Sequence, residues 1–194
     1  MALNPRLLRP PTELTSQRLS FRRYRAGDGA MYHQMLQVNW AHLYEFMPQE
    51  HLGIGSADDA EVVLARLAAE WESRNLFIFG VWEQASGAYV GECYLANPHW
   101  EVPCIEVGYF IVQARTGEGY ATEAAHAMLR YAFVELGVAR VELQCRLDNT
   151  ASQRVAEHCG FMLEGRFRRR HRMKSGALVD VLWYGLLREE WQVA

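Results

Sequence analysis

The joint between an apolar run and a helical pattern constrains this chain more than any other feature. Residues 105–112 form the apolar run, residues 121–136 form the helical pattern, and Gly117 and Gly119 lie between them. A strand that ends in a tight glycine turn and opens a helix points free backbone N–H groups at one spot, beside the positive end of the helix dipole. Glycine allows both close backbone approach and positive φ there. The joint therefore predicts a pyrophosphate site, although a Gly-x-Gly turn alone is a weak signal.

The composition is that of an ordinary globular protein. The 194 residues, of which 50% are hydrophobic and 22% charged, suffice for one domain whose core needs no disulfide or metal ion to stabilise it. A net charge of −3 disfavours a general nucleic-acid binder, because such proteins are usually basic. The four cysteines form no Cys-x-x-Cys pair and the seven histidines have no metal-ligand spacing, so we expect free thiols and no metal. No run approaches the ~20 apolar residues of a membrane span, and we expect a cytoplasmic protein.

The pattern of apolar residues predicts a single mixed domain. Strands are expected over residues 18–24, 77–82, 90–95, 105–112, 140–145, 162–170 and 177–187. Helices are expected from Asp28 toward Val38, from Ser56 with an apolar stripe of Val62, Val63, Leu67 and Trp71, over 120–136, and over 149–158. Turn residues at 84–87, 97–99 and 174–176 separate strands. This order indicates an α+β domain over residues 14–194, preceded by an N-terminal lead-in over residues 1–13.

Several short motifs follow one another along the chain. They are Arg18-Leu19, Glu106-Val107-Gly108-Tyr109, Gly117-Glu118-Gly119-Tyr120-Ala121-Thr122-Glu123-Ala124, Arg140-Val141-Glu142-Leu143, Asn149-Thr150-Ala151-Ser152, Cys159-Gly160-Phe161 and the tail Leu186-Leu187-Arg188-Glu189-Glu190-Trp191. In this order and spacing the series resembles the GNAT acetyltransferases, in the branch of the ribosomal-protein N-terminal acetyltransferases (RimJ/RimL-like). The resemblance implies a single-domain GNAT fold: a mixed, mostly antiparallel sheet with helices on both faces and splayed central strands.

The resemblance also implies an activity. It is acetyl-CoA-dependent transfer of an acetyl group to a primary amine, by direct attack on the thioester, with a protein or peptide N-terminal amine as the expected acceptor. A small amine, such as a polyamine, an aminoglycoside or a toxin, is the alternative acceptor. A non-catalytic acyl-CoA-binding regulator is the alternative function. Nucleic acid is expected only through a ribosomal substrate, no membrane or metal partner is expected, and a homo-oligomer stays open.

By the same resemblance, coenzyme A lies between the glycine turn and the splayed strands. Its expected contacts are Phe110, Ile111, Val112, Arg115, Thr116, Gly117, Glu118, Gly119, Tyr120, Ala121, Thr122, Asn149 and Ser152. Residues 109–112 should separate from residues 141–145, so that free backbone groups pair with pantetheine as an added strand would. An N–H of Phe110 or Ile111 should polarise the thioester oxygen. Thr116 departs from the family, which usually has Gln or Arg at this position.

A carboxylate in an apolar strand is the expected general base, because the amine must lose a proton and burial moves the pKa of a carboxyl toward neutrality. Glu106 is the first candidate and Glu92 the second, and each has the alternative role of a structural or amine-binding carboxylate. Ser152 is either a catalytic hydroxyl or a helix cap. Asn149 either bonds the pantetheine or holds the turn. Ala156 stands where many family members carry the Tyr or Ser that protonates the leaving thiolate, so any side-chain acid comes from elsewhere.

Two further segments have two interpretations each. Residues 165–174 hold six cations together with His171: Arg166, Arg168, Arg169, Arg170, Arg172 and Lys174. They form either a solvated sheet face or a contact for an acidic substrate or RNA. Residues 39–55 are irregular and rich in aromatic residues, including Trp40, Tyr44 and Phe46. These rings belong either to the core or, by the resemblance, over the acceptor site.

Overall fold

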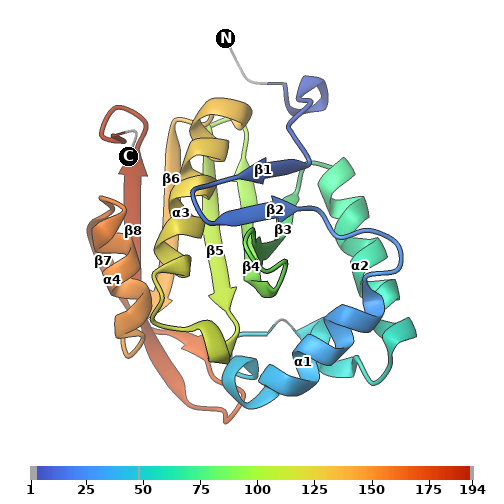
Figure 1. Ribbon diagram of the computed structural model, residues 1–194. Coiled ribbons are helices and arrows are strands. Elements are labelled where there is room, and N and C mark those ends of the chain that lie inside the picture. Colours follow the sequence, from blue (N-terminus) through green and yellow to red (C-terminus); the bar gives the residue numbers. More distant parts are fainter. Residues whose placement is uncertain (1–3, 48, 193–194) are drawn as a thin grey trace.

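The computed structural model describes residues 4–47 and 49–192, and its centre is one eight-stranded sheet (Figure 1). The strands are β1 (Glu13–Thr15), β2 (Leu19–Arg22), β3 (Leu76–Glu83), β4 (Tyr89–His99), β5 (Cys104–Ile111), β6 (Arg140–Arg146), β7 (Met162–Arg172) and β8 (Leu178–Leu187). Their order in the sheet is β1-β2-β3-β4-β5-β6-β8-β7. Every neighbouring pair is antiparallel except β5 and β6, which are parallel.

Helices pack on both faces of this sheet. They are α1 (Gly29–Leu43), α2 (Ala57–Glu72), α3 (Tyr120–Arg130) and α4 (Thr150–His158). Leu36 of α1 and Leu64 of α2 share a buried cluster with Ile78 of β3, whereas Met128 of α3 shares another with Phe79. Because successive side chains of a strand point to opposite faces, the two clusters are the two core layers. The expected α+β architecture with helices on both faces is confirmed.

The starts of the first two helices differ in how they are capped. Ser56 caps α2 as expected, because its Oγ accepts the backbone N–H of Asp59 at 3.1 Å. Asp28 was the expected cap of α1, and this prediction is wrong, since its side chain makes no capping bond. Its carboxylate instead accepts Arg22 Nη1 at 2.6 Å and the backbone N–H of Arg25 at 2.7 Å. The carboxylate of Asp28, which was expected to cap α1, therefore forms an ion pair with Arg22 instead.

The extents of both helices also differ from the pattern. Helix α1 continues past Val38 to Leu43, because buried side chains such as Leu36 and Leu43 keep one of its faces against the core. The apolar stripe of α2 includes Trp71, which is 2% exposed, but not Val62, which is 54% exposed. The free-energy cost of exposing one apolar side chain is too small to change which face of the helix packs against the core.

Further differences lie in strands and short helices. The expected break at residues 97–99 is wrong: β4 runs through His99, and Asn97 takes a positive φ of 52° where the register with β5 shifts. Strand β1 was not expected. The long helix expected over 120–136 is α3 followed by a π-helical turn, Tyr131–Leu136, and it ends at Gly137 with φ 74°. Three 3-10 helices complete the described chain: Pro5–Leu7, Gln49–Gly53 and Gln113–Arg115.

The centre of the sheet is splayed, as expected. Within the described residues β5 and β6 pair only through Cys104↔Arg140, Ile105↔Val141 and Glu106↔Glu142. Beyond Glu106, β5 keeps its pairing with β4 but has no strand partner on the other side. The backbone groups on that side of β5 therefore face a gap between two halves of the sheet.

Candidate functional site

A cleft of about 1330 Å³ occupies this gap. The splayed ends of β5 and β6 form its walls, and residues 115–122 with the start of α4 close one end. The other end is lined by side chains from the end of α1, from β6 and from β7, among them Phe46, Arg146 and His171. One continuous space thus joins the glycine turn to the opposite face of the sheet, where Glu106 lies.

The glycine turn has the backbone that its sequence suggested. Gly117 and Gly119 both have φ 83°, a left-handed conformation that side chains with a Cβ rarely adopt. Gly119 is the N-cap of α3, so the first N–H groups of this helix point toward the cleft end without helical partners. A Cβ built on Gly117 would meet no atom within 4 Å. The space around this turn is therefore open to a ligand.

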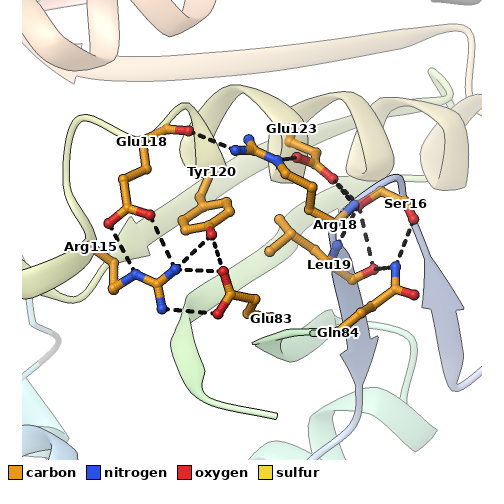
Figure 2. A network of polar contacts seen from close by, with 9 residues as sticks. All are labelled: Ser16, Arg18, Leu19, Glu83, Gln84, Arg115, Glu118, Tyr120 and Glu123. Atoms are coloured by element: carbon orange, nitrogen blue, oxygen red, sulfur yellow. Dashed lines mark hydrogen bonds and ion pairs between the residues drawn. The ribbon is translucent and has the colours of Figure 1, made fainter. Parts of the chain in front are cut away.

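Charged side chains tie the turn to the end of β3 (Figure 2). Arg115 Nη2 donates to Glu83 Oε1 at 2.6 Å and to the Tyr120 hydroxyl at 2.6 Å, and its Nε donates to Glu118 Oε1 at 3.0 Å. The Tyr120 hydroxyl also donates to Glu83. These bonds, led by that of Arg115, lower the pKa of Glu83 to about 2. Arg115 and Glu118 belong to the loop that is expected to bind the cofactor, and their side chains bind each other.

A second set of contacts ties α3 to the turn between β1 and β2 (Figure 2). Arg18 Nε donates to Glu123 Oε2 at 2.7 Å, and Ser16 Oγ donates to Glu123 Oε1 at 2.6 Å. Arg18 Nη1 also donates to the carbonyl of Glu118 at 3.0 Å. The loop that precedes α3 is thus held from two sides, by β3 and by the β1–β2 turn.

The start of α4 borders the same end of the cleft. Asn149 Oδ1 accepts the backbone N–H of Ser152 at 3.1 Å, so Asn149 caps α4. The Ser152 hydroxyl lies 3.0 Å from the hydroxyl of Tyr109 on β5. Ala156 is fully buried. The sequence motif around Tyr109 predicted no role for this side chain, although Tyr109 carries the single hydroxyl group of β5.

Glu106 stands at the point where the two strands part. Its Oε2 accepts Asn97 Nδ2 at 2.9 Å and Gln144 Nε2 at 3.1 Å. Burial raises the pKa of this carboxyl, the two amides lower it, and the neighbouring Glu142 raises it further. No ion pair reaches Glu106 among residues 4–47 and 49–192. Amide donors rather than an arginine therefore hold this carboxyl beside the cleft.

Glu92 occupies a different environment on the neighbouring strand. It is 5% exposed and does not line the cleft. Its Oε2 accepts the Tyr24 hydroxyl at 2.8 Å and the Tyr32 hydroxyl at 3.3 Å. Burial raises its pKa to about 7. The structure therefore does not bring the two candidate bases together in one cleft.

The end of α1 and the β7–β8 turn meet over the far end of the cleft. Lys174 donates its backbone N–H to Glu45 at 3.1 Å, and its ammonium nitrogen lies 4.4 Å from the centre of the Tyr44 ring. The guanidinium of Arg146 lies 4.8 Å from the centre of the Phe46 ring. Of the three aromatic residues singled out in this region, Phe46 lines the cleft, whereas Trp40 and Tyr44 pack against each other.

Two kinds of feature are absent from residues 4–47 and 49–192. No group of three or more His, Cys, Asp or Glu side chains is placed to hold a metal ion. None of the described helices has the length and apolar character needed to span a bilayer.

Comparisons with known proteins agree with this geometry. "Putative ribosomal N-acetyltransferase YdaF" of Bacillus subtilis (strain 168) is 36% identical over 87 residues, 45% of this chain and 47% of YdaF, about half its length. The structure of Mycobacterium smegmatis RimJ in complex with CoA-disulfide superposes with a TM-score of 0.80 and 26% identity over 89% of this chain and 83% of that chain. The family profile of the acetyltransferase (GNAT) domain matches residues 18–162. The chain therefore belongs to the GNAT family of acetyltransferases.

Proposed function

We propose that this protein transfers the acetyl group of acetyl-CoA to a primary amine, with the N-terminal amine of a protein or peptide as acceptor. One observation carries the proposal: a single cleft joins the glycine turn before α3 to a half-buried carboxyl through the gap between β5 and β6. The relative RimJ has been crystallised with CoA-disulfide, which supports a coenzyme A site in this cleft. The name of YdaF supports an acceptor of the ribosomal type.

The residues at the glycine turn fit a diphosphate. Backbone N–H groups of residues 117–119 and the first turn of α3 would bind it, and the open space at Gly117 leaves room for it. The edge of β5 beyond Glu106, which has no strand partner on the side of β6, would bind the pantetheine arm, and an N–H of this edge would polarise the thioester carbonyl. Acetyl-CoA supplies the acyl group as an activated thioester. Arg115 and Glu118 contribute by fixing the turn, since their side chains bind each other.

The proton chemistry falls to one carboxyl and one pair of hydroxyl groups. Glu106 would take the proton of the incoming amine, because it lines the cleft and burial raises its pKa. The geometry favours Glu106 over Glu92, which lies outside the cleft. At the other end, the Tyr109 and Ser152 hydroxyls lie 3.0 Å apart beside the cleft and would donate a hydrogen bond to the leaving thiolate. They would serve in place of a hydroxyl at Ala156.

Thiol release from acetyl-CoA tests this function. The purified protein is mixed with acetyl-CoA and a panel of peptides, polyamines and aminoglycosides, and coenzyme A binding is measured in parallel by calorimetry. We expect binding, together with thiol release that depends on a peptide amine. Normal binding with no turnover on any acceptor would instead support the non-catalytic regulator. Turnover only with polyamines or aminoglycosides would support the small-amine alternative.

A further inference from the structure

Strand β7 carries an unusual concentration of positive charge. Six of the chain's 20 lysines and arginines lie within residues 166–174. Strand β7 is also an edge of the sheet, and most of its residues are exposed on both faces. The whole chain nevertheless has a net charge of −3. The positive charge is therefore local to this edge and does not reflect the overall composition.

Most arginines outside β7 are already neutralised by carboxylates. In the described part of the chain nine of them form ion pairs: Arg18, Arg22, Arg23, Arg25, Arg74, Arg115, Arg130, Arg140 and Arg146. On β7, Arg166 pairs with Asp180. Arg168, Arg169, Arg170 and Arg172 form no ion pair within residues 4–47 and 49–192. These four guanidinium groups are available to a partner of opposite charge.

The basic strand leads into the cleft. His171 of β7 lines the cleft, as does Arg146 of β6. The turn that follows β7 contacts the end of α1, where Lys174 binds Glu45. Arg166 pairs with Leu182 and Arg172 with Leu178, because the register of β7 shifts between Phe167 and His171. The cations therefore span about 13 Å, which corresponds to about four residues of an extended peptide. A polypeptide whose first residue enters the cleft can therefore lie along these cations with the residues that follow.

We infer that β7 is the docking surface for the acceptor, and that this acceptor is a polypeptide with acidic residues shortly after its N-terminal amine. The inference rests on the proposed function and selects between its acceptors. A polyamine or aminoglycoside carries several positive charges and is repelled by the cations around this end of the cleft. An acidic peptide segment is attracted by them.

A nucleic acid fits this surface less well than an acidic peptide. The positive stripe is one strand wide, and carboxylates flank it: Glu164 on β7 itself, Asp180 on β8 and Glu45 at the cleft. Nucleic-acid surfaces need broad positive fields, because every nucleotide adds a phosphate. A positive stripe one strand wide offers no such field to a longer phosphate backbone.

Three matched peptides test the inference. They share their first three residues, and residues 4–9 are rich in Glu, Gln or Lys. We expect kcat/KM to be about tenfold or more higher for the Glu-rich than for the Lys-rich peptide at low salt, and higher than for spermidine. This preference should shrink as salt rises, because the contacts are exposed. Arg168→Glu with Arg170→Glu should abolish it, whereas the matched control Arg66→Glu, on the exposed face of α2, should retain it.

The outcomes separate this inference from the proposed function. Thiol release at equal rates from all three peptides overturns the inference alone, and so does a higher kcat/KM for spermidine. Coenzyme A binding without any thiol release overturns the proposed function and the inference together. A 20-nucleotide oligo-uridine is the last probe. If it binds, if the double variant loses that binding, and if peptides show no charge preference, the surface is an RNA surface and the inference is wrong.

Discussion

The two ends of the cleft are built in opposite ways. At the cofactor end, the turn over residues 115–119 is held by Arg115 bound to Glu83 and by Arg18 bound to both Glu118 and Glu123 (Figure 2). At the proposed acceptor end, the segment after α1 is contacted by Lys174 of the β7–β8 turn and by Arg146 of β6, which stacks on Phe46. A ligand that is common to a whole family can be bound by a rigid loop. An acceptor that differs between relatives is better met by exposed residues that can change without disturbing the core.

The largest expected effect belongs to Glu106, between the two ends. Glu106→Gln should lower kcat by about 10²-fold or more, because the amide cannot take the amine proton. In the wild type, turnover should rise with pH as Glu106 loses its proton, and this rise should occur above the ordinary range of a glutamate because burial raises the pKa. Rates at several pH values measure both effects. Glu70→Gln, at an exposed position of α2, is the matched control. An unchanged rate and pH profile in Glu106→Gln would remove Glu106 from this role.

The next effect concerns the glycine turn. Gly117→Val should weaken coenzyme A binding by about tenfold or more, because a side chain there intrudes on the proposed diphosphate site. Gly160→Val is a close control: Gly160 has φ 81° against 83° for Gly117, and a Cβ on either glycine meets no atom within 4 Å. Both variants should lose about 1–2 kcal/mol of stability from the left-handed backbone. Calorimetry and thermal melting separate the two effects. Equal coenzyme A affinity in both variants would contradict the placement of the diphosphate.

A smaller effect is expected from loosening the turn without entering it. Glu83→Gln removes the charge that holds Arg115, so KM for acetyl-CoA should rise about fivefold while kcat at saturation changes little. Glu72→Gln is the control, since Glu72 pairs with Arg23 far from the turn. The folded pKa of Glu83 is about 2, so its contribution to stability is present above its ordinary pKa and is lost as pH falls toward 2. If KM moves equally in both variants, the turn does not depend on this ion pair.

The smallest catalytic effect is expected at Glu92, although its effect on stability is distinct. Its pKa is raised to about 7 in the folded protein, so the folded state keeps a proton that the unfolded chain loses near pH 4.5. This group therefore costs stability as pH rises from 4.5 to 7. Glu92→Gln should flatten that part of the melting profile and leave thiol release within about twofold of wild type. A loss of turnover as large as that of Glu106→Gln would return Glu92 to a catalytic role.

Local signals allowed the sequence to predict the backbone of the glycine turn. The strand, the glycine turn and the helix are neighbours in the chain, and each has its own signature: apolar alternation, positive φ at Gly117, and helical spacing to Gly137. The splay followed only from the family resemblance. Arg115 and Glu118 stay predicted cofactor contacts, and their side chains bind each other, which a one-dimensional pattern cannot show.

Long-range contacts explain most of what the sequence did not reveal. Glu83 lies 32 residues before Arg115, and Tyr109 lies 43 residues before Ser152. Their pairing depends on strand register, which no local pattern encodes. Asp28 had the chemistry of a helix cap, yet Arg22 on the adjacent strand competes for the same carboxylate. Of the three aromatic residues Trp40, Tyr44 and Phe46, only Phe46 lines the cleft, and no periodicity in the sequence distinguishes it from the other two.

The short parallel pairing of β5 and β6 has a mechanical consequence. Three pairs of residues at one end of β5 and β6 join the half-sheet β1–β5 to the half-sheet β6–β8–β7. The two half-sheets are not hydrogen-bonded to each other through these strands beyond that end. Any molecule that hydrogen-bonds along the open edge of β5 and also contacts α4 or β6 connects the two half-sheets where the protein itself does not. Occupancy should therefore stiffen the whole molecule, and its melting temperature should climb with the concentration of coenzyme A.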